Sequence, residues 1–500
     1  MADAPDGLLT VRSPADGAVL AELRRSSTEE VHEAVALARS AQGAWAERSA
    51  VDRAACLARL GERLAEEADA LVDAVRQETG RPTQEALVQE LLPAVVRCHT
   101  MPSRLPALQA GARVLHRVAR HRGGEARRVP YGVVAVLSPA PSPLGFGLAA
   151  AGDAAAAGNA VLLRPSSVAP TAALRACALA ASCGIPEGVL QAVVTDRPAA
   201  LELVGCVGVD RVLFAGAAET ARAVRCAAAA RGVPAVVQEG VPCTLVALED
   251  CDVGLVARAI VQGAFAGSGQ AGLAYQRVIA HDRVYDALVA EVVSLARGLR
   301  LGEDLGPMLR ASRVERLERL VAMAREDGAW VITGGQRVEP EGLWFPPTVV
   351  AGCGAPMAVF REEACGPLVA LARAPDDRAL LDLVRAAPVG PSVAVFGEDE
   401  DAAEALAWAL RAPVVLVNDL YPPTPEVALG PWARGSDGLL GGEEGLRAVT
   451  RPRYVGVSRW RWPVGAFWMP YAPGRERLAR RALGALFGAH GLLGRTLDLL

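Results

Sequence analysis

Lysine is absent from this sequence, and all 52 of its basic residues are arginine. Without lysine, the chain has no side chain that could form a Schiff base or act as an ammonium ligand for phosphate. Asparagine is also scarce, since only Asn159 and Asn418 are present. Any chemistry that needs an asparagine amide as a hydrogen-bond donor is therefore restricted to these two positions.

Several protein classes are disfavoured by what the sequence has little of. A net charge of −4 gives no basic excess, so nucleic acid is not expected as a partner. The ten cysteines include no CxxC pair, which predicts neither a zinc site nor a disulfide framework, and no metal is expected. The first residues lack a basic segment followed by an apolar one, so we expect no signal peptide.

Long hydrophobic runs are missing as well. The most apolar stretch, at 146–163, is interrupted by Asp153 and Asn159 and is rich in alanine and glycine, which does not favour a membrane span. Together with the missing signal peptide, this predicts a cytoplasmic protein.

What is present indicates a folded α/β protein of more than one domain. The chain has 500 residues, of which 52% are hydrophobic and 22% charged. Ser27 to Glu30 form a capping signal ahead of a helix at 31–41. A single long helix is predicted at 51–79, where Gly80 and Pro82 end it. Alternating apolar and basic residues around Gly123 predict a β-hairpin at 113–129.

Two series of short apolar runs alternate with helical patterns. The first series of predicted strands lies at 133–137, 160–163, 190–194 and 211–214, with a helix at 171–182 among them. The second lies at 244–248, 276–281, 330–333, 368–372, 392–396 and 414–417, with helices at 282–298 and 312–327. This alternation predicts two α/β units with doubly wound parallel sheets, which meet near residue 237.

Short motifs follow one another along both units. They lie at 13–17, 78–82, 130–134, 152–159, 184–189, 363–367, 417–419 and 442–446. Residues 184–189 have the form G-x-P-x-G-V, and 363–367 have the form E-x-F-G-P with Cys365 at the third position. In the order and spacing of these motifs, the stretch from about residue 11 to about residue 457 resembles the aldehyde dehydrogenase superfamily.

The resemblance implies the aldehyde dehydrogenase fold, with two doubly wound α/β domains and a small β oligomerisation arm. A Rossmann-like, NAD(P)-binding-type domain is expected at 1–110 and 131–236, and a catalytic-type domain at 237–430. The arm is expected at 111–130 and 447–458, and an aromatic and arginine-rich extension follows at 459–500. The resemblance also implies a dimer or tetramer, in which the arm offers strand edges to a partner subunit.

Two of the residues on which the family's chemistry depends are missing. The nucleophilic cysteine of G-Q-x-C-x-x-x-x-R falls on Gly272, which has no side chain to form a thiohemiacetal. The asparagine whose amide stabilises the oxyanion falls on Pro141, which has neither an amide side chain nor a backbone N–H.

The general base of the family, a glutamate, has two candidate positions here. An alignment without a gap places it at Gln238, which does not accept a proton at neutral pH, whereas a shift of one residue places it at Glu239. The alignment without a gap favours Gln238, because a slip of one residue at a strand end turns the side chain to the other face.

The family's cofactor positions are partly retained. The lysine that reaches the adenosine ribose is replaced by Arg164, which is followed by Ser166, and the pyrophosphate segment retains Phe214 and Gly216 without its two hydroxyls. Glu363 matches the glutamate that holds the nicotinamide ribose, although a carboxylate kept for packing explains it equally well. The resemblance thus implies NAD or NADP as a cofactor that is bound weakly or not at all.

Other features leave alternatives open. Cys243 follows the segment of the base and Cys365 sits in a cofactor motif, so either could replace the lost thiol, although a buried and inert cysteine is the simpler interpretation. In the extension, aromatic residues at 460–471 precede a predicted amphipathic helix at 475–493. This helix could touch a membrane surface, but packing on the body or on a partner subunit is the preferred interpretation.

Three functional hypotheses follow. The first is a pseudoenzyme that acts by binding, regulation or assembly, either as a homo-oligomer or with an active paralogue. The second is an NAD(P)-dependent aldehyde dehydrogenase that uses a displaced nucleophile such as Cys243. The third is binding or hydrolysis of an acyl or aldehyde ligand without a cofactor. A nucleotide-binding test separates the third hypothesis from the second.

Overall fold

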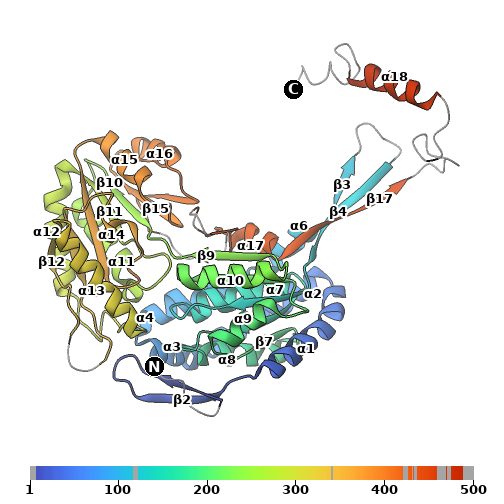
Figure 1. Cartoon of the computed structure of the whole chain (residues 1–500), viewed down its shortest axis with the longest axis horizontal. Helices are drawn as coiled ribbons and strands as arrows, with labels where there is room; N and C mark the ends of the chain where they lie inside the picture. Colours follow the sequence, from blue (N-terminus) through green and yellow to red (C-terminus); the bar gives the residue numbers. More distant parts are fainter. Residues whose placement is uncertain are drawn as a thin grey trace. The chain divides into compact units, whose positions relative to one another are not determined.

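Two parallel sheets organise most of the chain (Figure 1). The computed structural model describes residues 7–115, 122–338, 342–420, 426–430, 432, 436–458, 469 and 474–487. The chain divides into unit 1, comprising Met1–Ala110 and Arg128–Pro452, and unit 2, comprising Gly111–Arg127 and Arg453–Leu500. Both parallel sheets belong to unit 1. The predicted α/β class is therefore confirmed.

The smaller parallel sheet has five strands in the order β7-β6-β5-β8-β9. They are β5 (Val133–Leu137), β6 (Ala160–Arg164), β7 (Leu190–Ala192), β8 (Arg211–Gly216) and β9 (Ala235–Glu239). Val134 and Val136 of β5 join one hydrophobic core, whereas Val133 and Ala135 join another. Since successive side chains of a strand point to opposite faces, the sheet is buried on both faces, which explains its continuous apolar runs.

The helices of this half cover both faces of the sheet. They are α1 (Thr28–Glu47), α2 (Ala50–Glu66), α3 (Ala68–Thr79), α4 (Thr83–Glu85), α5 (Leu92–His99), α6 (Met101–Gln109), α7 (Ala149–Ala156), α8 (Thr171–Ala178), α9 (Arg197–Gly205) and α10 (Ala218–Ala230). Two π-helices, η1 (Ala86–Leu91) and η2 (Pro143–Leu148), and a 3₁₀-helix, η3 (Leu179–Cys183), lie among them. The predicted capping box of Ser27 and Glu30 starts α1. The long helix predicted at 51–79 is wrong, because α2 and α3 separate at Glu67.

The larger sheet has seven strands in the order β12-β13-β14-β11-β10-β15-β16, and only β12 is antiparallel to its neighbour. They are β10 (Thr244–Ala247), β11 (Arg277–His281), β12 (Trp330–Thr333), β13 (Thr348–Ala351), β14 (Leu368–Ala374), β15 (Ser392–Phe396) and β16 (Val414–Val417). Its helices are α11 (Val253–Phe265), α12 (Asp282–Gly298), α13 (Ala311–Glu326), α14 (Ala358–Arg361), α15 (Asp377–Ala386) and α16 (Glu400–Ala409), with a 3₁₀-helix η4 (Ala266–Gly269). A later helix, α17 (Gly442–Ala448), packs instead against α6 and α7 of the other half.

Two antiparallel elements complete the fold. β1 (Leu8–Arg12) pairs with β2 (Val19–Arg24) in unit 1. A three-stranded sheet in the order β17-β4-β3 is formed by β3 (Ala112–Leu115), β4 (Arg122–Pro130) and β17 (Thr450–Ser458). This sheet contains the predicted hairpin and the strand predicted near 447–458. The boundaries of the predicted functional domains stay a prediction.

Two further expectations concern what is absent. Among the described residues, no helix is long and apolar enough to cross a membrane. The structure describes α18 (Arg475–Phe487) of the C-terminal extension, whereas most of the aromatic stretch and the predicted end of this helix lie outside the described residues.

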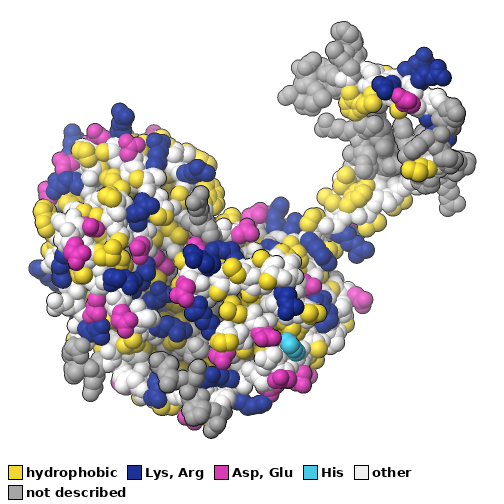
Figure 2. Space-filling view, in the orientation of Figure 1, with side chains coloured by type: hydrophobic (Ala, Val, Ile, Leu, Met, Phe, Trp, Pro, Cys, Tyr) yellow, Lys and Arg dark blue, Asp and Glu magenta, His cyan; other side chains and the backbone are white. Residues whose placement is uncertain are grey.

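On the visible face, arginine side chains are interspersed with acidic ones rather than gathered in one basic patch (Figure 2).

Candidate functional site

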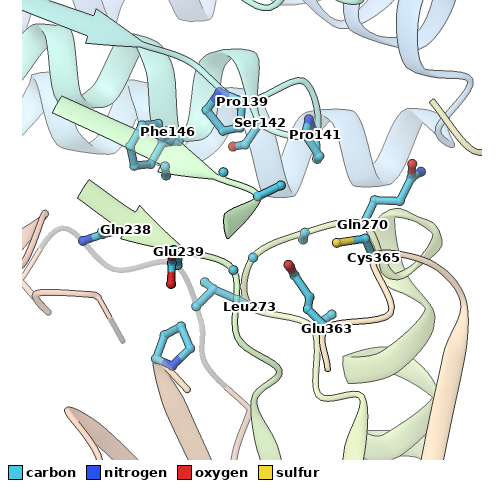
Figure 3. A pocket seen from close by; sticks show the side chains of 18 of the residues that line it. Pro139, Pro141, Ser142, Phe146, Gln238, Glu239, Gln270, Leu273, Glu363 and Cys365 are labelled. Atoms are coloured by element: carbon cyan, nitrogen blue, oxygen red, sulfur yellow. The ribbon is translucent and has the colours of Figure 1, made fainter. Parts of the chain in front are cut away.

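A large cleft in unit 1 receives side chains from both parallel sheets. Its volume is about 1660 Å³. Most of the predicted site residues line it, namely Pro141, Arg164, Ser166, Phe214, Gly216, Gln238, Glu239, Gly272 and Glu363. Figure 3 shows Pro141 and Ser142 in the loop after β5, and Glu363 and Cys365 in the segment before β14. The fold therefore brings the positions singled out from the sequence into one place.

The loop that carries Gly272 has a strained backbone that many contacts hold. Ser268 has φ 55° between Gly267 and Gly269, which also have positive φ. For a residue other than glycine this conformation is costly, so the surroundings must enforce it. The Ser268 hydroxyl donates a 2.7 Å hydrogen bond to the carbonyl oxygen of Gly306. The Gln276 amide binds the carbonyl oxygens of Gly269 and Gly366, each at 2.8 Å.

At the centre of this ordered loop, Gly272 leaves open space. A Cβ atom built on Gly272 would meet no atom within 4 Å outside its immediate chain neighbours, and the residue is exposed in the cleft. The position therefore has room for a side chain and supplies none. No covalent bond between a substrate carbonyl and residue 272 can form.

Pro141 faces the cleft from a loop that buried charges fix. The carbonyl oxygen of Pro141 accepts a 2.7 Å hydrogen bond from Arg81 Nη2. Arg81 also pairs with the buried carboxylate of Glu90 at 3.3 Å. Glu90 in turn accepts hydrogen bonds from the backbone N–H groups of Leu144 at 3.0 Å and Gly145 at 2.9 Å, at the start of η2. The loop is thus rigidly placed, but at Pro141 it offers an oxyanion no N–H donor.

Both candidates for the general base are already engaged. Gln238 is 9% exposed, and its Nε2 donates a 2.7 Å hydrogen bond to the carbonyl oxygen of Leu429. The Glu239 carboxylate pairs with Arg225 of α10 at 3.0 Å. The Glu239 carboxylate is thus already held in an ion pair. Because the two residues alternate at the end of β9, only one of them can share the face of the lost glutamate.

The structure does not support Cys243 as a substitute nucleophile. Its side chain is 0% exposed in a hydrophobic core, and burial raises the pKa of its thiol to about 12. Among the described residues that line the cleft, Cys365 is the one cysteine. Cys365 has φ 51° and is 8% exposed. Burial raises the pKa of this thiol, and the neighbouring charge of Glu363 raises it further.

A family model and solved structures match almost the whole of this chain. The model of the aldehyde dehydrogenase family matches residues 2–455. The chain belongs to the aldehyde dehydrogenase family.

Solved structures of this family superimpose closely. PnpE from Pseudomonas sp. WBC-3 is 25% identical with a TM-score of 0.88, and the match covers 92% of this chain and 96% of PnpE. An NAD⁺ complex of an aldehyde dehydrogenase from Bacillus cereus is 25% identical, with a TM-score of 0.86 and coverage of 90% and 93%. Lactaldehyde dehydrogenase from Escherichia coli, at 22% identity and a TM-score of 0.87, covers 91% of this chain and 96% of its own, and shows the fold alone.

The positions where the family binds its cofactor are crowded but ordered. Arg164 donates to the hydroxyl and carbonyl oxygens of Thr195, at 3.2 and 2.8 Å. Desolvation, then the charge of Arg310, lowers the pKa of Arg164 to about 10. The Phe214 ring lies against Gly216, where an added Cβ would be 2.7 Å from the ring, so a larger residue at this position would require the ring to move. The Ser166 hydroxyl accepts a 3.3 Å hydrogen bond from the N–H of Val168.

Glu363 lies across the backbone of the base segment. A Cβ on Gly240 would be 2.0 Å from Glu363 Oε2, so the carboxylate occupies the space that this glycine leaves. Desolvation raises the pKa of Glu363, while a hydrogen bond from Cys365 and the charges of Arg313 and Arg316 oppose this shift. Glu363, in the segment before β14, therefore lies close to the segment after β9 that contains Gly240.

Several arginines that line the cleft were not predicted from the sequence. Arg310, Arg313 and Arg316 line it around the start of α13. Desolvation lowers the pKa of Arg310, and the charges of Arg313 and Arg197 lower it further. Their spacing of three residues was a readable signal, because residues three apart share one face of a helix. Among the described residues there is no group of three or more His, Cys, Asp or Glu suited to a metal.

Proposed function

We propose that this aldehyde dehydrogenase family member binds a small molecule in its cleft without oxidising aldehydes through a thiol at the family position. One observation carries the proposal: the space in front of Gly272 is open, and no side chain fills it. The chain would then act by binding, by regulation or by assembly with active subunits. A cytoplasmic location stays a prediction.

Two further positions support the proposal. Catalysis by acyl transfer needs donors aimed at the developing oxyanion, and removing one such donor typically costs a factor of about 10² to 10³ in rate. Pro141 has no such donor, and its carbonyl oxygen is bound to Arg81. The base position holds either the amide of Gln238 or a carboxylate paired with Arg225. An alignment error at one position would leave the other two losses unexplained.

The ligand we favour is NAD or NADP. α10 begins at Ala218 without a side-chain cap, and Ala217 and Ala218 line the cleft, so backbone N–H groups at this helix start would hold the pyrophosphate of the nucleotide. Arg164 and Glu363 flank the same cleft. These residues fit the nucleotide. When bound, the nicotinamide supplies a hydride acceptor, but residue 272 supplies no thiol to form the hydride donor.

A second candidate is NAD(P)-dependent aldehyde oxidation with a non-standard nucleophile. The observation that favours it is Cys365, which lines the cleft together with Glu363. In this candidate, Glu363 would accept the thiol proton. The raised pKa of Cys365 opposes this candidate, because the thiolate is the reactive form.

The test measures two quantities on one preparation of the full chain. Calorimetric titration with NAD⁺ and NADP⁺ reports nucleotide binding, and absorbance reports NAD(P)H formation with short, long and aromatic aldehydes. The proposal expects saturable binding without turnover. Turnover that Cys365→Ala abolishes would establish the second candidate instead, and turnover that survives this substitution would contradict both.

A further inference from the structure

A charged group lies in the cleft at Asp153, which interrupts the most apolar stretch of the sequence. Asp153 is the single charged residue of α7, whose other residues are alanine and glycine. Its carboxylate approaches Arg97 of α5, with Oδ2 at 3.2 Å from Nε, and Arg104 of α6 acts on the same carboxylate. Arg97, Asp153 and Arg104 are called the Arg97 group below.

The Arg97 group is not satisfied by protein alone. Within the described part of the chain, four buried atoms of the group have no hydrogen-bond partner: Nε and Nη2 of Arg97, Nη1 of Arg104 and Oδ1 of Asp153. The contact between Arg97 and Asp153 is close enough for an ion pair but lacks hydrogen-bond geometry. Asp153 is only 3% exposed. Buried polar atoms without partners are costly, so such a cluster indicates a missing binding partner.

The group is built into the wall of the cleft. Arg97 and Asp153 both line it, and Arg104 behind them donates a 2.7 Å hydrogen bond to the carbonyl oxygen of Gly442. Gly441 has φ 83°, and a Cβ there would lie 2.6 Å from Arg97 Nη2. The backbone thus makes room for the guanidinium. Ala150, about one turn before Asp153, also lines the cleft.

The net charge of the Arg97 group determines which ligand it would bind. The group holds two guanidiniums and one buried carboxylate, which leaves one net positive charge. The charge of Glu426 also acts on Arg104, but Glu426 is exposed and therefore screened. Arg97 lines the cleft, and its guanidinium suits a carboxylate. Asp153 also lines the cleft, and its carboxylate suits a hydroxyl or amino group beside the carboxylate of the ligand. Leu440 and Val449 add apolar surface in the same cleft.

We propose that the Arg97 group binds the polar end of a small carboxylate that carries an adjacent hydroxyl or amino group. The ligand carboxylate accepts hydrogen bonds from Arg97, and its hydroxyl or amino group donates to Asp153. This inference rests on the proposed function, since it names the class of molecule that the cleft would hold beside or in place of a nucleotide.

The experiment titrates the full chain with three probes of equal length: 2-hydroxybutanoate, butanoate and butan-1-ol. The expected order of affinity is 2-hydroxybutanoate, then butanoate about tenfold weaker for one lost hydrogen bond, with no saturable binding of the alcohol. Arg97→Gln is expected to weaken both acids at least about tenfold. Arg59→Gln is the control, because Arg59 binds the Cys183 carbonyl oxygen and does not line the cleft.

A second variant covers the case in which Arg97→Gln does not fold. Asp153→Asn keeps the shape of the side chain and is expected to reduce the preference for 2-hydroxybutanoate over butanoate. Equal affinities for the two acids and the alcohol, or butanoate affinity unchanged in Arg97→Gln, would mean that the group holds only water and would overturn the inference. Aldehyde turnover with the acid preference intact would overturn the proposed function alone.

Discussion

At position 272 the chain keeps an ordered loop and presents no side chain to the cleft. The conformation of Ser268, with φ 55°, and the hydrogen bonds of Gln276 hold this loop in place. Strained and over-determined backbone of this kind is typical of functional sites. In this loop the strained backbone surrounds Gly272. The loop has therefore lost only the side chain at position 272, and the backbone around that position is kept.

This confinement predicts that Gly272→Cys folds normally. The built Cβ meets no atom within 4 Å, so the new thiol should point into open cleft. Of the ten native cysteines only Cys226 is exposed, so thiol titration of the wild type should show one fast-reacting group and the variant two. Mass spectrometry after brief alkylation identifies the modified residue. A folded Gly272→Cys variant whose added thiol stays unreactive would contradict the open site.

Gln238 is predicted to be required as an amide. Its Nε2 donates to the Leu429 carbonyl oxygen at 2.7 Å, so Gln238→Glu would set a carboxylate against a carbonyl oxygen. Losing the bond and desolvating the charge should lower the free energy of unfolding by about 1–3 kcal/mol at neutral pH. The loss should shrink at low pH, where the new carboxyl is protonated and can donate. Urea unfolding at two pH values measures this, and equal losses at both would contradict the assignment.

At the scale of elements, Glu78 of the 78–82 motif caps the first turn of another helix. Glu78, near the end of α3, accepts hydrogen bonds from the backbone N–H of Thr171 at 3.0 and 3.1 Å, where α8 begins. α8 has no side-chain cap of its own. Glu78 therefore joins two helices that are distant in the sequence, which gives this residue of the 78–82 motif a structural role.

Glu78 also makes stability depend on pH. Desolvation raises its pKa from 4.5 to about 7. Below pH 4.5 both states are protonated; between 4.5 and about 7 the folded state keeps a proton that the unfolded state releases, so stability falls as pH rises. The loss amounts to about 3 kcal/mol and is complete above pH 7. Glu78→Gln should remove this component, so its stability relative to wild type should rise between pH 5 and 8. Urea unfolding measures the free energy of unfolding of both proteins across this pH range. A constant difference between Glu78→Gln and wild type would contradict this role of Glu78.

The sequence predicted elements well where the signal was local. The predicted strands at 133–137 and 392–396 and the helix at 282–298 coincide with β5, β15 and α12, because β-branched runs and helical periodicity are properties of neighbouring residues. The break at Glu67 and the π-helices were missed. The Arg97 group was missed as well, since its members meet only when α5, α6 and α7 pack together.

At the scale of the whole molecule, unit 2 carries an exposed strand edge. β17 lies at one edge of its sheet, and Val455 and Val457 are 54% and 59% exposed. Unpaired edges with apolar side chains are ready-made pairing surfaces. This supports our proposal that the protein is a homo-oligomer or assembles with an active paralogue.

Light scattering tests that proposal. We expect a dimer or tetramer in the wild type and a lower mass for Val455→Asp, because a charge on the exposed face of β17 would have to be desolvated at an interface. Val207→Asp is the matched control, since Val207 is 86% exposed in a loop of unit 1. A monomeric wild type, or an unchanged mass in Val455→Asp, would contradict this role of unit 2.

The measurement that tests the central claim most directly is NAD(P)H formation from aldehydes by the purified, folded wild-type chain. Cys365→Ala is assayed beside it. With Gly272 and Pro141 in the places of the thiol and the amide, the account predicts no turnover above the rate without protein. Turnover that depends on aldehyde and on protein concentration would contradict it, and its loss in Cys365→Ala would identify the nucleophile.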